Sequence, residues 1–266
     1  MKILVLSLLG LFLVFCGLAQ AIDESLVLYF SFDEGQGNNA KDGSLAKNHG
    51  KYIGKPKWVN GKPGKAVSYD GAGTFEIQHH NSLNALKGKG HTISYWLNWD
   101  GQGASWSPFI SKTIGENDNF HTWVGKDGIW DYENKPSGQT HAVTKIPLDG
   151  NWIHLTVTHD GKKTVSFYIN GKLDKATNPL PTAIGNDINV LVGDDGKGNK
   201  GAGILDELSI FNRALTAEEA KTIYEDGVAP FLAIAPTEKL TATWGISSVK
   251  QQDRLSSISY DLSANA

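Results

Sequence analysis

The sequence predicts an all-β protein, built as a two-sheet antiparallel jelly-roll sandwich with one short C-terminal helix. Three observations predict this fold: short segments alternate apolar and polar residues, Gly, Asn, Asp and Pro cluster between them, and only one segment is convincingly helical. Short strands separated by turns are typical of antiparallel sandwiches, whereas a parallel sheet needs helices between its strands. The chain has 266 residues, of which 40% are hydrophobic, and is therefore long enough to bury a core without disulfides.

A three-stranded meander is the clearest local prediction. Residues 152–159 and 164–169 each alternate, Asp160-Gly161 separates them, and Asn170-Gly171 precedes a third strand. Asn-Gly favours a tight hairpin because both residues tolerate the positive φ that a type I′ turn requires. The same pattern predicts ten further strands, at 26–32, 65–69, 74–78, 91–99, 109–113, 119–125, 128–132, 140–146, 187–192 and 203–211.

The predicted helix follows the last strand. Thr216 and Glu219 have the spacing of a capping box, 217–225 is rich in helix formers, and Gly227 stands where a C-terminal left-handed residue belongs. Prolines and a Ser-rich stretch then indicate that residues 229–266 are a linker and C-terminal tail.

The first 21 residues have the features of a secretory signal peptide. Lys2 precedes an apolar run at 3–18, and Ala19-Gln20-Ala21 is a small-x-small cleavage signal. This run is shorter than the stretch of about 20 apolar residues that crosses a bilayer, so we expect no integral membrane segment in the mature chain. The protein is expected to be secreted, periplasmic or at the cell surface, with 22–228 as its working domain.

Charge and cysteine content exclude several classes of partner. The chain has a formal net charge of −3 and a single Cys. We therefore expect no nucleic-acid partner and no binding to an anionic membrane surface. A single Cys also excludes an intramolecular disulfide framework and a Cys-based zinc cluster.

Six segments carry a resemblance to a known family. They are LYFSFDEG at 28–35, GKPGKAVSYDG at 61–71, TISYW at 92–96, WIHLTVTHDG at 152–161, FYING at 167–171 and ILDELSIFNRALT at 204–216. In this order they resemble the laminin-G-like (LamG) domains of the concanavalin A-like lectin and glucanase superfamily. The resemblance implies a two-sheet jelly roll, often with a structural calcium ion, used mostly to recognise carbohydrate or protein outside cells.

Catalysis is not expected. The glucanase branch of this superfamily carries Glu-x-Asp-x-x-Glu on one strand, which places a nucleophile and an acid/base on the same face. The nearest string here, at 116–121, ends in His121 instead of a carboxylate, and Asp131 and Glu133 are expected to be solvated loop acids. Gly-x-Ser-x-Gly, phosphate-loop and His-Glu-x-x-His motifs do not occur.

Calcium is the cofactor that the resemblance implies, because Ca²⁺ takes oxygen ligands from carboxylates and backbone carbonyls. Asp206 is the first candidate ligand, and the resemblance also draws on Asp33, Asp70 and Gly71. Two roles stay open for Asp206, metal ligand or buried hydrogen-bond acceptor. Asp33 and Asp70 precede turns and would otherwise cap them. Asp194-Asp195-Gly196 is expected to be a solvated turn.

A sugar site is predicted on two neighbouring strands. Alternation puts His121 and Trp123 on one face of their strand, and Trp130 and Tyr132 on one face of the next. If these two faces coincide, the four side chains form an aromatic platform for a sugar ring. Otherwise the aromatic residues belong to the core. Trp106, in a Gly/Ser loop, is a further exposed candidate.

Two functions therefore stay open, and a third is kept as a test. The first is a secreted, non-catalytic, lectin-like module that binds carbohydrate. The second is an extracellular protein-binding or adhesion module without sugar affinity. The third, a divergent glycoside hydrolase, predicts release of reducing sugar. The expected partner is accordingly a glycan or an extracellular protein.

Overall fold

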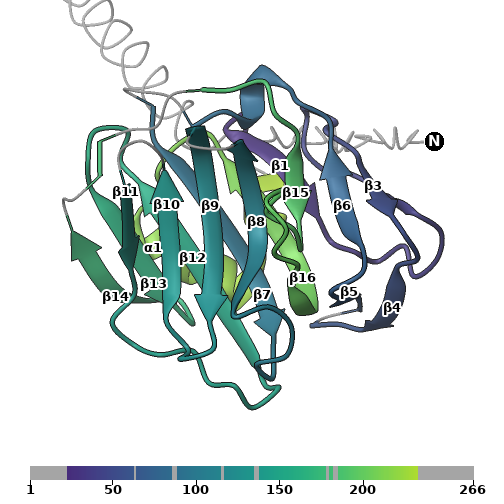
Figure 1. Cartoon of the computed structure of the whole chain (residues 1–266). Coiled ribbons are helices and arrows are strands. Elements are labelled where there is room, and N and C mark those ends of the chain that lie inside the picture. The colour runs from purple at the N-terminus through teal and green to yellow at the C-terminus, as the bar shows by residue number, and fades with distance from the viewer. Residues whose placement is uncertain are drawn as a thin grey trace, which may run out of the picture. The chain divides into compact units, whose positions relative to one another are not determined.

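Two antiparallel sheets of eight strands each form the fold (Figure 1). The computed structural model describes residues 23–62, 64–85, 89–114, 117–134, 138–177, 180–181 and 185–232. The predicted all-β, two-sheet antiparallel sandwich is confirmed. The signal peptide predicted at 1–21 lies outside the described residues, as does most of the predicted tail.

The first sheet, named sheet I, has the strand order β14-β13-β12-β7-β16-β5-β4, and β1 also pairs with β16. Its strands are β1 (Leu26–Phe30), β4 (Lys57–Asn60), β5 (Lys65–Asp70), β7 (His91–Asn98), β12 (Trp152–His159), β13 (Val165–Ile169), β14 (Lys172–Thr177) and β16 (Ala202–Phe211). The strands β12, β13 and β14 form the predicted meander. Asn170 and Gly171 connect the last two, with φ of 48° and 71°.

The second sheet, named sheet II, has the order β11-β10-β9-β8-β15-β6-β3-β2. Its strands are β2 (Asn39–Ala40), β3 (Gly50–Ile53), β6 (Thr74–Ile77), β8 (Trp106–Ile114), β9 (Asn117–Gly125), β10 (Trp130–Asn134), β11 (Gly138–His141) and β15 (Val190–Val192). Figure 1 shows β8, β9 and β10 side by side. The strands β2, β3 and β4, which lie at or next to a sheet edge, were not predicted. The strand β11 covers 138–141, where the prediction was 140–146.

The core lies between the two sheets and is rich in aromatic side chains. Trp130 of β10 meets Phe167 of β13 edge to face, with ring centroids 5.0 Å apart. Tyr95 of β7 also contacts Phe109 of β8 across the sheets, with tilted rings whose centroids are 6.3 Å apart. All four side chains are at most 1% exposed, so each buries a large apolar area that stabilises the sandwich.

Two short α-helices follow the last strand, where one was predicted. The helix α1 (Ala217–Asp226) has the predicted capping box between Thr216 and Glu219. The second helix, α2 (Ala229–Leu232), places Phe231 against Phe211, with ring centroids 5.3 Å apart. Residues 229–232 therefore pack with the domain. A single 3-10 turn, η1 (Asn81–Leu83), occurs earlier. No helix in the described part of the chain is long and apolar enough to cross a membrane.

Candidate functional site

A hollow of about 210 Å³ lies on the outer face of sheet II, and we name it the β9–β10 hollow. Strands β8 to β11 form its floor, and the loop between β15 and β16 forms part of its rim. Its lining combines two indole rings with side chains that can form hydrogen bonds. The lining residues are Trp106, His121, Trp123, Glu133, Gln139, Asp195, Lys197 and Asn199.

The register between β9 and β10 decides which side chains reach the hollow. His121 lies opposite Glu133, and Trp123 lies opposite Asp131. Side chains alternate between the faces of a strand, and directly paired residues share a face. His121 and Trp123 therefore share the outer face with Asp131 and Glu133. That His121 and Trp123 lie on the same face of their strand agrees with the prediction from alternation.

The predicted four-residue aromatic platform is wrong for its second strand. Trp130 and Tyr132 pair with Val124 and Thr122, so their side chains point into the core, and both are 0% exposed. The Tyr132 hydroxyl lies 2.6 Å from Nε2 of His91, a hydrogen bond within the sandwich. The two aromatic faces do not coincide, and only His121 and Trp123 contribute to the outer surface.

His121 is the most unusual side chain in the hollow. Its side chain is 10% exposed, and its ring lies 4.6 Å from the ring of Trp123. Nδ1 lies 3.8 Å from Oε2 of Glu133, and among the described residues neither ring nitrogen has a hydrogen-bond partner. A buried polar group without a partner costs about 1–3 kcal/mol. A bound ligand with hydroxyl groups could supply the missing hydrogen bonds.

The rim loop is held firmly against the sheet. The hydroxyls of Ser111 and Thr113 donate hydrogen bonds of 2.6 Å to the carbonyls of Asp194 and Asp195. The Asp195 carboxylate accepts from the Asn199 backbone N–H at 3.0 Å and from its side-chain amide at 2.6 Å. Asp194 and Asp195 are 5% and 2% exposed, so the prediction of a solvated turn was wrong.

Trp106 forms the exposed part of the rim. It is the first residue of β8, pairs with Gly125, and is 64% exposed. The prediction that Trp106 is exposed is confirmed. Trp106 is not an isolated surface residue, because it lines the same hollow as Trp123.

The carboxyl groups on β10 are not solvated loop acids. Asp131 and Glu133 are each 8% exposed and occupy successive outward positions of the strand. Burial, with the nearby charges of Asp127 and Glu133, raises the pKa of Asp131 to about 7. Glu133 lines the hollow, whereas Asp131 does not. The motif residue Glu116 lies outside the described residues.

The four predicted calcium ligands do not form one group. Asp70 pairs with Ala202, four residues before Asp206 on β16, and that separation corresponds to about 13 Å along a strand. Asp70 accepts a hydrogen bond from the backbone of Ala72 across the turn that contains Gly71, whose φ is 83°. Asp70 and Gly71 therefore form a turn distant from Asp206.

Asp206 is fully buried, and both of its carboxylate oxygens already accept hydrogen bonds. The donors are the backbone N–H groups of Lys62, at 2.6 Å, and Glu207, at 2.9 Å. Asp33 accepts from the backbone of Lys65 at 2.8 Å. Within the described ranges, no three His, Cys, Asp or Glu side chains converge on a point that could hold a metal ion. This geometry fits the role of buried acceptor better than that of calcium ligand, and calcium binding stays a prediction.

The two stacked antiparallel sheets define a jelly-roll sandwich. The chain belongs to the concanavalin A-like lectin/glucanases superfamily, because the laminin-G family model of that description matches residues 70–221. This confirms the resemblance read from the six segments. Comparison with curated proteins gives no match.

Of three solved structures with the same fold, two are binding domains. The chain is similar to the binding domain of Paraclostridial Mosquitocidal Protein 1, with a TM-score of 0.65, 17% identity, and coverage of 76% of this chain and 52% of that one. Domain 4 of AbnA, a GH43 extracellular arabinanase from Geobacillus stearothermophilus, was solved in complex with arabinotriose. Its TM-score is 0.62 at 20% identity, and the match covers 76% of this chain and 98% of that domain. The receptor-binding domain of botulinum neurotoxin mosaic serotype C/D has a TM-score of 0.61 at 14% identity, and the match covers 78% of this chain and 52% of that one.

The chain thus spans about half the length of the mosquitocidal and neurotoxin chains that it matches. At these identities the similarity shows the fold alone, since one fold hosts many functions.

Proposed function

We propose that this protein is an extracellular, non-catalytic carbohydrate-binding module that holds a sugar in the β9–β10 hollow. The observation that carries the proposal is the buried imidazole of His121, whose two nitrogens have no hydrogen-bond partner among the described residues. It lies in a hollow that Trp123 and Trp106 also line. The sugar complex of the AbnA domain supports the same choice of ligand class.

Each part of the hollow has a role in this account. An indole ring offers a flat apolar surface to the C–H groups of a sugar, and polar side chains fix the orientation of its hydroxyls. Trp106 and Trp123 would provide the apolar surface, while His121 and Gln139 would bond to hydroxyls. Drug-sized ligands occupy pockets of about 300–1,000 Å³, so a hollow of about 210 Å³ suits one sugar residue or the end of a chain.

A binding role is favoured over hydrolysis by the state of the carboxyl groups. Retaining glycosidases place two carboxyl groups about 5–5.5 Å apart on either side of the scissile bond. Two carboxylates, Glu133 and Asp195, line the hollow. The oxygens of Asp195 accept hydrogen bonds from Lys197 and Asn199, which hold the rim loop together. Of the two carboxyl groups that line the hollow, Asp195 is thus used by the rim loop, and Glu133 lies 3.8 Å from Nδ1 of His121.

The test is binding of the full chain to a glycan array, followed by titration of the best oligosaccharide by calorimetry. Trp106→Ala should weaken binding by about tenfold or more, because a stacked aromatic ring contributes about 1–3 kcal/mol to such contacts. This variant should fold, since Trp106 is 64% exposed. Leu173→Ala, at a 56% exposed position on β14 of sheet I, is the matched control and should bind normally.

Three results would contradict the proposal. If Trp106→Ala binds the oligosaccharide as tightly as the parent does, the hollow is not the sugar-binding site. Release of reducing sugar by the purified chain would favour the hydrolase alternative. Absence of binding to every glycan, together with capture of a defined extracellular protein, would favour the adhesion alternative.

A further inference from the structure

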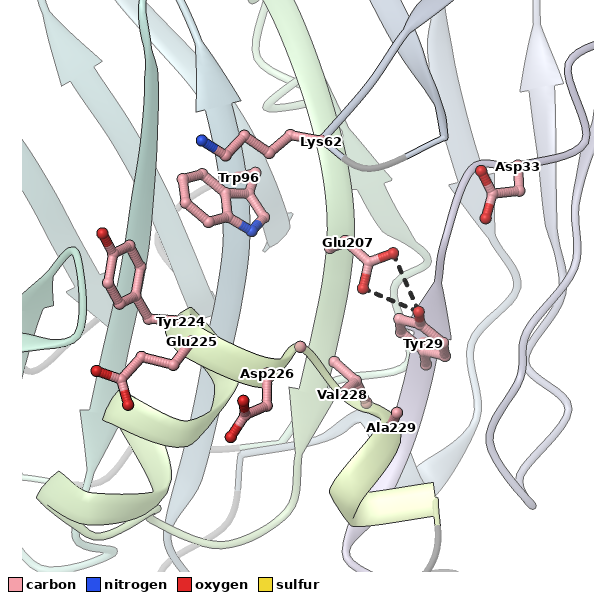
Figure 2. Close-up of a pocket in the computed structure, with 11 residues that line it drawn as sticks. Tyr29, Asp33, Lys62, Trp96, Glu207, Tyr224, Glu225, Asp226, Val228 and Ala229 are labelled. Atoms are coloured by element: carbon pink, nitrogen blue, oxygen red, sulfur yellow. Dashed lines mark hydrogen bonds between the residues drawn. The ribbon is translucent and has the colours of Figure 1, made fainter.

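A larger cavity, of about 680 Å³, lies on the outer face of sheet I beside α1 and is separate from the β9–β10 hollow. We name it the β16–α1 cavity (Figure 2). Its wall includes three aromatic rings, one lysine and several acidic side chains. These include Tyr29, Asp33, Lys62, Trp96, Glu207, Tyr224 and Asp226.

The aromatic part of the wall already attracts a cation. Nζ of Lys62 lies 4.9 Å from the ring centroid of Trp96, within the distance of about 6 Å at which an ammonium group is attracted to an indole face. Tyr224 of α1 lies beside the same ring, at 5.6 Å between centroids. Figure 2 shows Lys62 and Trp96 together at the same side of the cavity.

The acidic part of the wall is rich in negative charge. Glu207 accepts hydrogen bonds of 3.1 and 2.9 Å from the Tyr29 hydroxyl, and Asp33 and Asp226 line the cavity too. The carboxyl groups that line the cavity outnumber the single ammonium group of Lys62, so a second positive charge in the cavity would be attracted.

The C-terminal end of α1 adds to the same field. The last turn of a helix carries partial negative charge and usually attracts basic side chains. The last turn of α1 has no basic residue and instead carries Glu225 and Asp226, which line the cavity with the following Gly227. Glu225 pairs with Lys221 at 3.9 Å, so an organic cation in the cavity would compensate chiefly the charge of Asp226.

We propose that the β16–α1 cavity is a second binding site, for a ligand that carries an ammonium group. The ammonium group contacts Trp96 and Tyr224 and is neutralised by Glu207 and Asp33. Lys62 competes for the same aromatic face, so its side chain opposes binding. The group could come from a lysine side chain of a peptide or from an amino sugar, which share this chemistry.

The experiment is calorimetric titration of the full chain with two ammonium probes, an N-acetylated Gly-Lys-Gly amide and a glucosamine trimer. Their neutral counterparts are the peptide acetylated at Nζ of its lysine and the N-acetylglucosamine trimer. We expect at least one ammonium probe to bind and its neutral counterpart to bind at least about tenfold more weakly. The probe that binds identifies the source of the group. Failure of both ammonium probes, or equal binding of the neutral ones, would overturn the proposal.

Two variants give opposite expectations. Glu207→Gln should weaken binding by roughly threefold to tenfold, whereas Lys62→Ala should strengthen it by roughly threefold, by freeing Trp96 and removing a like charge. Glu218→Gln on the exposed side of α1 and Lys172→Ala on β14 repeat the charge changes at exposed positions and should have little effect. Weaker binding by Lys62→Ala, or unchanged binding by Glu207→Gln, would overturn the proposal.

The design also separates this site from the proposed function. Because the trimers are sugars, their titrations are made on the Trp106→Ala variant, in which the hollow on sheet II is weakened, and the ammonium probe should still bind to this variant. If Glu207→Gln does not fold, the exposed Lys62 still decides the question, because Lys62→Ala removes a like charge and should therefore strengthen binding of the ammonium probe more than binding of its neutral counterpart.

Discussion

His154 gives the domain a specific sensitivity to acid. This residue of β12 is 1% exposed, and its ring lies 5.0 Å from the ring of Trp96. Nε2 lies 3.1 Å from the Ser94 hydroxyl, whereas Nδ1 has no hydrogen-bond partner among the described residues. Burial lowers the pKa of His154 from 6.5 to about 3, because the charged imidazolium is poorly solvated there.

This pKa shift makes the free energy of unfolding depend on pH. Between pH 7 and pH 5 the unfolded chain protonates at His154 and the native chain does not, so stability is lost as the pH falls. Each pH unit below the unfolded-state pKa of 6.5 costs about 1.36 kcal/mol of stability. Since pH 5 lies 1.5 units below that pKa, the free energy of unfolding falls by about 2 kcal/mol. Other groups also titrate in this range, and comparison with His154→Gln isolates this contribution.

The assay is urea unfolding at pH 7 and pH 5, followed by tryptophan fluorescence. The parent should be more stable than His154→Gln at pH 7, and this difference should be about 2 kcal/mol smaller at pH 5. His141→Gln, at an exposed position on β11, is the matched control substitution. A difference for His154→Gln that does not change with pH would refute the reasoning.

Three further predictions concern stability. Trp130→Ala should lower the free energy of unfolding by about 3–5 kcal/mol in urea titrations, because the ring is fully buried against Phe167; a cost below about 1 kcal/mol would contradict its place in the core. Thr216→Ala should cost about 1 kcal/mol by removing the N-cap of α1, and an unchanged urea midpoint would argue against the capping box. If calcium binds at Asp206, EDTA should lower the melting temperature of the parent and have no effect on Asp206→Ala; no change in the parent would exclude structural calcium there.

Much of the fold could be predicted because turn residues and alternation act locally. Asn170-Gly171 connects β13 to β14 with both residues at positive φ, as a tight hairpin requires. The strands β3 and β4 escaped prediction because they are only four residues long and lie near the sheet edges, where polar residues are tolerated. The helix α2 escaped because Pro230 was read as a linker signal, although proline is compatible with the first turn of a helix.

The site could be predicted only in part, because alternation alone does not fix register. It shows that His121 shares a face with Trp123, and that Trp130 shares one with Tyr132. Which pair faces the core depends on the register across the turn at 125–129, and a slip of one residue exchanges the two faces. The rim loop at 194–200 reaches the hollow only because β15 pairs with β8, a contact between segments about 80 residues apart.

The most direct test of the sugar site uses the chain's tryptophans as position markers. The protein has eight Trp residues, and fluorine NMR of the 5-fluorotryptophan-labelled chain can follow each one once single substitutions have assigned the signals. Addition of the oligosaccharide selected on the array should shift the signals of Trp106 and Trp123 and leave those of the buried Trp99 and Trp130 in place. Saturable binding that shifts neither Trp106 nor Trp123 would contradict the account.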